Sequence, residues 1–397
     1  MNPPQVAILV ETSREYGRGL LRGIMRYQQE HGPWSVFFTP QGLNEPPPPW
    51  LARWKGDGIL ARINSPQMAQ TILKTGLPAI DLRGALYRTN LPVIGIDNRR
   101  IIQMAMEHFL ARGFRRFAFC GTPPGEHRYQ DERCDVFMQS VRALGMECAV
   151  FEHPKRAVSW EQDQRNLMRW LSRLPKPVAL MTCHDDRGQQ VLNACLRAHI
   201  PVPDQIAVLG VDNDEFLGNL CTPPLSSVDV DASQIGYAAA AMLEALMRGE
   251  APRDPWVLLP PRGIVERRST SVLAIEDTHM ALAARVLREN ACSPLTVQEA
   301  FRQIPLSRSA AYRRYRKLFP TPPKRQQFLE RMARACELLT ETTLPVAEVA
   351  RKLGYQESKY FIAVFRAHTG TTPLQYRKKS APKPHRSAQA APNSPRV

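Results

Sequence analysis

The sequence predicts a two-lobed α/β domain followed by an all-α domain that contains two helix-turn-helix units. In residues 1–272, short apolar runs alternate with helical patterns in two successive series, as expected for parallel sheets with crossover helices. In residues 273–397, one helical pattern occurs twice, 49 residues apart. A chain of 397 residues is long enough for two or three domains with substantial cores.

The charge divides the chain at the same place. The whole chain has 53 Lys and Arg against 37 Asp and Glu, a formal net charge of +16. Residues 1–272 carry 31 basic and 28 acidic side chains, whereas residues 273–397 carry 22 and 9. An excess of +13 on one third of the chain predicts that this part binds nucleic acid.

Other classes of protein are disfavoured. The chain has no run of 18 apolar residues, and its N-terminus lacks the basic and apolar regions of a signal peptide, so we expect a cytoplasmic protein without a membrane partner. The eight cysteines show neither CxxC nor zinc-site spacing. We expect them to be reduced thiols that pack in the interior.

The expected elements of the first domain follow in order along the chain. The expected strands are 6–10, 34–38, 58–60, 79–81, 93–96 and 117–120, then 146–151, 179–182 and 206–211. The expected helices are 17–31, 104–112, 131–144, 161–173 and 187–198.

Three motifs in this domain suggest other chemistry, and the residues argue against each. Residues 17–23 have three glycines, but the third is one place late for a dinucleotide-binding turn and the preceding strand is too far away. Residues 212–214 open like a calcium loop, but the fifth position is Phe216, which cannot bind a hard cation. Residues 184–186, His-Asp-Asp, are better explained as a polar loop at a strand end than as a metal or acid–base site. We therefore expect no cofactor, no metal and no catalytic residue.

Polar side chains follow several strands, at the sheet edge where α/β domains bind ligands. Asp and Asn acceptors and an Arg donor suit the hydroxyls of a sugar, and an aromatic ring can cover its apolar face. The candidate ligand-binding residues are Tyr16, Asp81, Arg133, His184, Asp212 and Asn213.

Residues 5–272 resemble the periplasmic-binding-protein-like domain of lac-repressor-family regulators. The matching motifs are VLGVDN at 208–213, PPLSSV at 223–228, GYAA at 236–239 and VERRST at 265–270. The resemblance implies that Asp212 and Arg133 bind sugar hydroxyls and that His184, often Asn in relatives, faces the ligand. The family's N-terminal DNA-binding headpiece does not precede this domain, so DNA binding is expected elsewhere.

The second domain contains the repeat. Thr296 and Glu299 form a capping box, and Val297, Ala300, Phe301 and Ile304 form an apolar stripe that Val346, Val349, Ala350 and Leu353 repeat. Each stripe is followed by a turn and a second helix, which predicts helix-turn-helix units at about 296–319 and 345–368. A helix at 323–341 joins them and spans about 28 Å, so the two second helices are expected to reach successive major grooves.

The second helix of each unit supplies the candidate DNA contacts. In the first unit these are Ser307, Arg308, Ser309, Tyr312 and Arg313 toward base edges, and Arg314, Arg316 and Lys317 toward phosphates. In the second unit they are Gln356, Glu357, Ser358 and Lys359 toward bases, and Arg366 and Arg377 toward the backbone.

The tandem arrangement resembles the AraC/XylS family of arabinose-type regulators. The matching residues are 349–355, 360–361, 365–366, 370–373 and 376–377, whereas Pro320 and Ala311 depart from the family pattern in the first unit. A lac-repressor-type sensor in front of such a domain resembles the xylose-operon regulator (XylR-type) family over residues 5–378. That resemblance implies promoter or operator DNA, a homodimer, contact with RNA polymerase, and D-xylose as the first candidate among sugars.

We therefore expect a sugar-responsive transcription regulator, an activator of a sugar-catabolic operon, in which lobe closure acts through the linker near residues 269–277. One alternative is a regulator that binds DNA without a ligand and uses the front domain only for dimerisation. Another is a sugar-binding protein or an enzyme. Residues 380–397, rich in Pro, Ala and Ser, are expected to form a disordered basic tail.

Overall fold

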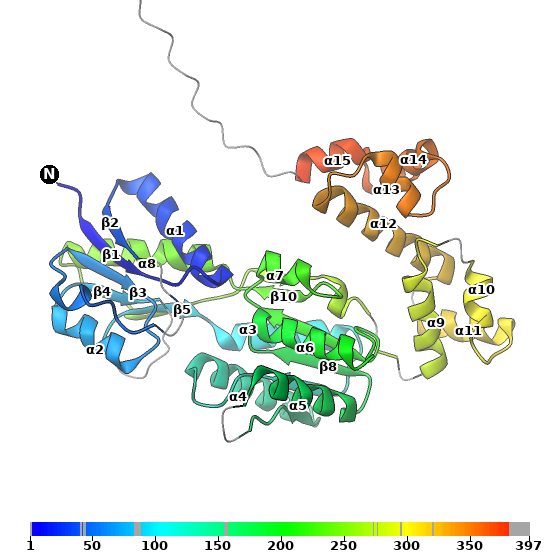
Figure 1. The fold of residues 1–397 in the computed structure, drawn as a ribbon, viewed down its shortest axis with the longest axis horizontal. Coiled ribbons are helices and arrows are strands. Elements are labelled where there is room, and N and C mark those ends of the chain that lie inside the picture. Colours follow the sequence, from blue (N-terminus) through cyan, green and yellow to red (C-terminus); the bar gives the residue numbers. More distant parts are fainter. Residues whose placement is uncertain are drawn as a thin grey trace, which may run out of the picture. The chain divides into compact units, whose positions relative to one another are not determined.

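A computed structural model describes residues 2–39, 42, 45–82, 89–154, 158–272, 274–275, 277–293, 296–319 and 321–380. The chain divides into two compact units, Met1–Ala274 and Ile275–Val397. The first is a two-lobed α/β unit and the second is helical, so the predicted fold class is confirmed (Figure 1). Pro320 and all of the predicted tail beyond Ser380 lie outside the described residues.

The first lobe is built on a six-stranded parallel sheet in the order β11-β5-β4-β3-β1-β2. Its central strands are apolar runs that are buried on both faces, as in other sheets covered by crossover helices. The strands are β1 (Gln5–Leu9), β2 (Ser35–Phe38), β3 (Gly58–Ala61), β4 (Ala79–Asp81), β5 (Val93–Ile96) and β11 (Trp256–Leu259), with α1 (Glu15–His31), α2 (Pro66–Thr75), α8 (Ala232–Met247) and the 3₁₀ turn η1 (Leu51–Arg53).

The second lobe repeats this plan in the order β12-β10-β9-β8-β6-β7, with only β12 antiparallel to its neighbour among the described pairings. The chain passes between the lobes after β5, after β10 and after β11. The strands are β6 (Phe117–Cys120), β7 (Cys148–Val150), β8 (Val178–Thr182), β9 (Ile206–Val211), β10 (Ser226–Asp229) and β12 (Gly263–Val265). The helices are α3 (Asn98–Ala111), α4 (Arg128–Ala143), α5 (Trp160–Arg173), α6 (Asp185–Arg197) and α7 (Glu215–Leu220), followed by the 3₁₀ turn η2 (Arg268–Thr270).

Some elements differ from the sequence-based expectation. Helix α3 begins six residues before the expected Met104, because the Asp97 side chain accepts a hydrogen bond from the Arg100 N–H at 3.1 Å and caps it. Elements α2, α7, α8 and β10 to β12 had not been predicted from residue patterns. Helix α8 is apolar on several faces because α1 and the first sheet cover it, so it shows no clear polar stripe.

The helical unit contains two small cores. Phe301 and Tyr315 are buried in the first core, and Phe361 and Phe365 are buried in the second. The predicted capping box at Thr296 is present. The helices are α9 (Thr278–Glu289), α10 (Val297–Arg302), α11 (Arg308–Leu318), α12 (Pro323–Glu341), α13 (Val346–Lys352), α14 (Ser358–Thr369) and α15 (Pro373–Ser380).

All eight cysteines are free thiols, as their spacing predicted; four of them are buried and the other four are only partly buried, so the expectation that they all pack in the interior holds for half of them. A helix able to cross a bilayer would need about 20 mostly apolar residues. The described parts of the chain contain no helix of that kind.

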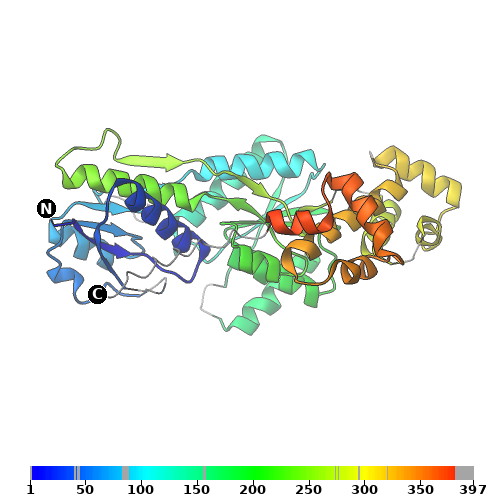
Figure 2. The same cartoon turned by 90° about the horizontal axis from the view of Figure 1, so that it is seen from above.

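Of the three glycines in residues 17–23, Gly19 and Gly23 bring α1 and α8 into close contact, and the two helices lie side by side (Figures 1 and 2). A Cβ at Gly19 would lie 2.6 Å from the Ala232 Cβ, and a Cβ at Gly23 would lie 1.9 Å from the Ser233 carbonyl oxygen. The structure therefore gives these glycines a role in helix packing.

We predict that Gly23→Ala lowers the thermal unfolding midpoint, because the added methyl group forces α1 away from α8 at a cost of about 1–3 kcal/mol. Calorimetry of the full chain measures this change. Gly263→Ala is the matched control, since a Cβ there meets nothing within 4 Å. Equal midpoints for the two variants would contradict the packing role.

Candidate functional site

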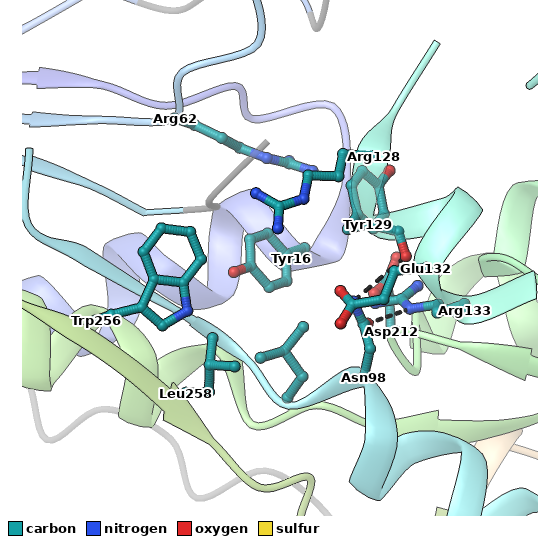
Figure 3. A pocket seen from close by; sticks show the side chains of 11 residues that line it. Tyr16, Arg62, Asn98, Arg128, Tyr129, Glu132, Arg133, Asp212, Trp256 and Leu258 are labelled. Atoms are coloured by element: carbon teal, nitrogen blue, oxygen red, sulfur yellow. Dashed lines mark hydrogen bonds between the residues drawn. The ribbon is translucent and has the colours of Figure 1, made fainter. Parts of the chain in front are cut away.

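A cavity of about 170 Å³ lies between the two lobes of the first unit. It is smaller than the roughly 300–1,000 Å³ typical of drug-sized ligands and suits a ligand of monosaccharide size. Its walls come from α1, β5, β11 and the end of β3 on one lobe, and from α3, α4 and the end of β9 on the other (Figure 3). The lining residues are Tyr16, Arg62, Ile96, Asn98, Arg128, Tyr129, Glu132, Arg133, Asp212, Trp256 and Leu258.

The polar wall is organised around Arg133, of which only 2% is exposed. Its Nε donates to Asn98 Oδ1 at 2.8 Å, and its Nη1 donates to the Cys183 carbonyl. Asn98 in turn donates from Nδ2 to Glu132 Oε2 at 2.7 Å. These bonds fix the directions of a guanidinium, an amide and a carboxylate beside the cavity.

Asp212 reaches this wall from a strained turn after β9. Its φ is +106° and that of Asn213 is +52°, both in the region that favours glycine. The Asp212 N–H donates to the Val228 carbonyl and the Asn213 N–H to Ser227 Oγ, each at 3.0 Å. Burial raises the pKa of Asp212, while the positive charge of Arg133 opposes the increase.

The opposite wall carries two aromatic rings. The Tyr16 hydroxyl donates to the Leu82 carbonyl at 3.0 Å, which fixes the ring, and the Arg62 guanidinium lies 4.7 Å from the centre of that ring. Arg62 forms a buried ion pair with Glu11. Figure 3 shows the Trp256 ring on one side of the cavity and the polar groups on the other. An apolar ring facing hydrogen-bonding groups is a suitable environment for a sugar.

Three of the six predicted ligand-binding residues, Tyr16, Arg133 and Asp212, line the cavity together. The other three, all in the described part of the chain, are placed in other contacts. Asp81 accepts a hydrogen bond from the Ile63 N–H at 3.4 Å, His184 caps α6 through Nδ1, and Asn213 accepts from Arg267 at 2.9 Å. Their role in ligand binding stays a prediction.

Several lining residues had not been predicted from the sequence. Arg62 directly follows β3 and Asn98 lies two residues after β5, so the strand-end rule that selected Asp212 could have selected them as well. Trp256 gave no such signal, because its strand, β11, was not predicted and comes from a distant part of the chain.

In the helical unit, α11 separates its apolar and basic residues. Ala311 and Tyr315 are buried, whereas Ser307, Arg308, Ser309, Arg313, Arg316 and Lys317 are exposed. The ring of Tyr312 packs against Phe301 at 5.1 Å, and Arg314 lies 3.5 Å from Asp277. The predicted base and phosphate contacts on this helix are therefore mostly accessible to a partner.

The second unit shows the same separation with one difference. At the start of α14, Gln356, Glu357 and Lys359 are exposed and Ser358 is half-buried, and Arg366 is exposed further along the helix. Arg377 instead donates to the carbonyls of Leu339 at 3.1 Å and Leu344 at 2.6 Å. The structure thus gives Arg377 a part in tying α15 to the end of α12.

Comparisons with known proteins agree with both units. Residues 106–270 match the model of a periplasmic binding protein-like domain, and residues 300–379 match a helix-turn-helix domain. The xylose operon regulatory protein of Escherichia coli K12 is 30% identical over 386 residues, which is 94% of this chain and 96% of that protein. The protein of the same name from Haemophilus influenzae is 27% identical over 380 residues, covering 94% of this chain and 98% of the relative.

A solved structure described as the xylose-binding transcription activator xylR has a TM-score of 0.80 and 28% identity, and it covers 96% of this chain and 100% of its own. Fold, cleft and comparisons define a sugar-responsive, DNA-binding transcription regulator and not an enzyme, as predicted from the sequence. The chain belongs to the xylose operon regulator family.

We predict that Arg308→Ala or Arg313→Ala relaxes the preference for one base position by about 1–3 kcal/mol, because we expect these exposed side chains to contact base edges. Lys317→Ala, the control, should weaken binding to all sequences alike, because we expect Lys317 to contact phosphate. Binding of the full chain to a set of operator variants, followed by fluorescence anisotropy, measures both. A uniform loss of affinity for the arginine variants would contradict their assignment to bases.

Proposed function

We propose that the protein is a transcription activator whose effector is D-xylose, bound in the cavity between the lobes. The observation that supports this most directly is the cavity itself, in which Asn98, Arg133 and Asp212 face the rings of Tyr16 and Trp256 in a space of about 170 Å³. The names of the relatives from E. coli and H. influenzae, and of the solved xylose-binding activator, favour xylose over other sugars.

In this proposal, Asp212 and Asn98 accept hydrogen bonds from vicinal hydroxyls, and Arg133 and Asn98 donate to ring or hydroxyl oxygens. Trp256, 42% exposed on β11, covers the apolar face of the sugar. Because Asn98, Arg133 and Asp212 belong to one lobe and Tyr16 and Trp256 to the other, a sugar that contacts both sets favours the closed arrangement of the lobes.

Helix α3 provides a route from the cavity to the second unit. It begins with Asn98 in the cavity wall, and the next residue after its end, Arg112, holds the chain that leads out of the first unit. Arg112 donates from Nε to the Thr270 carbonyl at 3.0 Å and pairs with Glu266, and the Ala274 N–H donates to the Arg112 carbonyl at 2.8 Å. Helix α3 has 14 residues and is about 21 Å long, so it extends from the cavity wall to residue 112.

We propose that a shift of α3 on sugar binding is passed to residues 270–274 and so changes the affinity of the helical unit for DNA. In this proposal, α3 is the element through which lobe closure acts on the linker near residues 269–277. We also propose that the protein acts in the cytoplasm as a homodimer at promoter DNA and contacts RNA polymerase, which the family relationship supports.

We predict that D-xylose raises the thermal unfolding midpoint of the full chain, because a ligand at 100 times its Kd adds about 2.7 kcal/mol to the free energy of unfolding. Asp212→Ala should weaken binding more than tenfold by removing a charged acceptor. Asp229→Ala, a carboxylate of the same lobe paired with Arg262, is the control and should keep wild-type affinity.

D-Ribose, L-arabinose and D-glucose are measured beside D-xylose. A midpoint that moves with one of these sugars and not with D-xylose would show that the effector is another sugar. If none of these sugars moved the midpoint, the proposed sugar effector would be wrong, and the alternative of a regulator that binds DNA without a ligand would be favoured.

We predict that Arg112→Ala leaves the affinity for D-xylose within about twofold of wild type and reduces the effect of D-xylose on operator affinity. The reason is that the substitution removes the hydrogen bond between Arg112, at the end of α3, and the Thr270 carbonyl. Arg248→Ala, which removes an exposed arginine paired with Glu244 and Glu250, is the control. Operator titrations with and without D-xylose measure the coupling. Wild-type coupling in Arg112→Ala would rule out this route.

A further inference from the structure

Asp185 is a buried carboxylate that the ligand cavity does not use directly. It belongs to the His-Asp-Asp motif at residues 184–186, is the first residue of α6 and is only 3% exposed. Its Oδ1 accepts a hydrogen bond from Ser227 Oγ at 2.6 Å, and its Oδ2 accepts one from the Asp214 N–H at 2.7 Å. Both partners belong to the turn that carries Asp212 or to the strand beside it.

With these bonds, each backbone N–H of the 212–214 turn has a hydrogen-bond acceptor. The N–H of Asp212 is bound by the Val228 carbonyl, that of Asn213 by Ser227 Oγ, and that of Asp214 by Asp185. The Ser227 hydroxyl therefore accepts from Asn213 and donates to Asp185, so the carboxylate supports two of the three N–H groups. A turn with two consecutive left-handed residues that are not glycine persists only when its surroundings hold it in place.

The neighbouring strand is shaped to admit this carboxylate. A Cβ at Gly210, on β9, would lie 2.1 Å from Asp185 Oδ1, so only glycine leaves room for it. Burial, with the negative charge of Asp212 nearby, raises the pKa of Asp185.

The same turn also reaches the other lobe. Asp214 accepts from Arg18 of α1 at 3.0 Å, and Asp186, next to Asp185, pairs with Arg14 at 2.9 Å. Asp185 thus lies beneath a segment that presents Asp212 to the cavity on one side and contacts the first lobe on the other.

We propose that Asp185 is a positioning residue for the sugar site. It holds the 212–214 turn in the conformation that directs the Asp212 carboxylate into the cavity before the sugar arrives, and it touches no sugar atom itself. The proposal rests on the proposed sugar site for its functional meaning. Its structural part, that the turn depends on Asp185, is independent of which sugar binds.

The first measurement is hydrogen–deuterium exchange of the full chain without sugar. Asp185→Ala removes both acceptors and should increase exchange in residues 210–217 at least tenfold. Asp185→Asn keeps an acceptor for the Asp214 N–H and should restore part of the protection. The matched control is Asp163→Ala, which removes a carboxylate that accepts from the buried Arg187 at 2.7 Å in the same lobe.

The second measurement is the affinity for D-xylose by titration calorimetry. We expect about tenfold weaker binding for Asp185→Ala, an intermediate value for Asp185→Asn and the wild-type value for Asp163→Ala. Unchanged exchange in Asp185→Ala would overturn the proposal, and so would faster exchange with wild-type affinity. If the wild-type chain bound no D-xylose, the proposed effector would be wrong, and exchange would still decide whether Asp185 holds the turn.

Discussion

The ligand-facing side of the second lobe depends on one buried guanidinium. A buried charge is tolerated only when its donors are satisfied, and Arg133 finds acceptors in the Asn98 side chain and the Cys183 carbonyl. These bonds draw together α4, the start of α3 and the end of β8. The start of α3 is therefore held in place in part by the acceptor that Arg133 requires.

The sequence identified only some of the cavity-lining residues that lie near strand ends, since Arg62 and Asn98 were missed. Tyr16 and Asp212 were identified from their position after strands, Arg133 from its position at the start of a helix, and the family resemblance supported Asp212 and Arg133; the cavity is lined by all three. Position after a strand does not fix the direction of a side chain. His184 turns back to cap α6, and Asp81 accepts from the backbone of Ile63.

Trp256 was inaccessible to sequence reasoning for a topological reason. It lies on β11, which follows the strands of the second lobe in the sequence but pairs with β5 at the edge of the first lobe's sheet. In the helical unit, by contrast, the repeat of apolar residues placed both helix pairs correctly. What the repeat could not show was whether a basic side chain such as Arg377 would face DNA or bind the carbonyls of its own domain.

The threefold passage of the chain between the lobes has a consequence for synthesis on the ribosome. The first lobe cannot complete its sheet until β11 has been made, and the second lobe waits for β12 only a few residues later. Neither sheet is complete until these late strands are made. Until then β5 lacks its neighbour β11, and β10 lacks its neighbour β12. At about 5–20 residues per second, the sensor becomes complete just before the helical unit is translated. The order of the units along the chain therefore places all strands of both lobes ahead of the basic helical unit in synthesis.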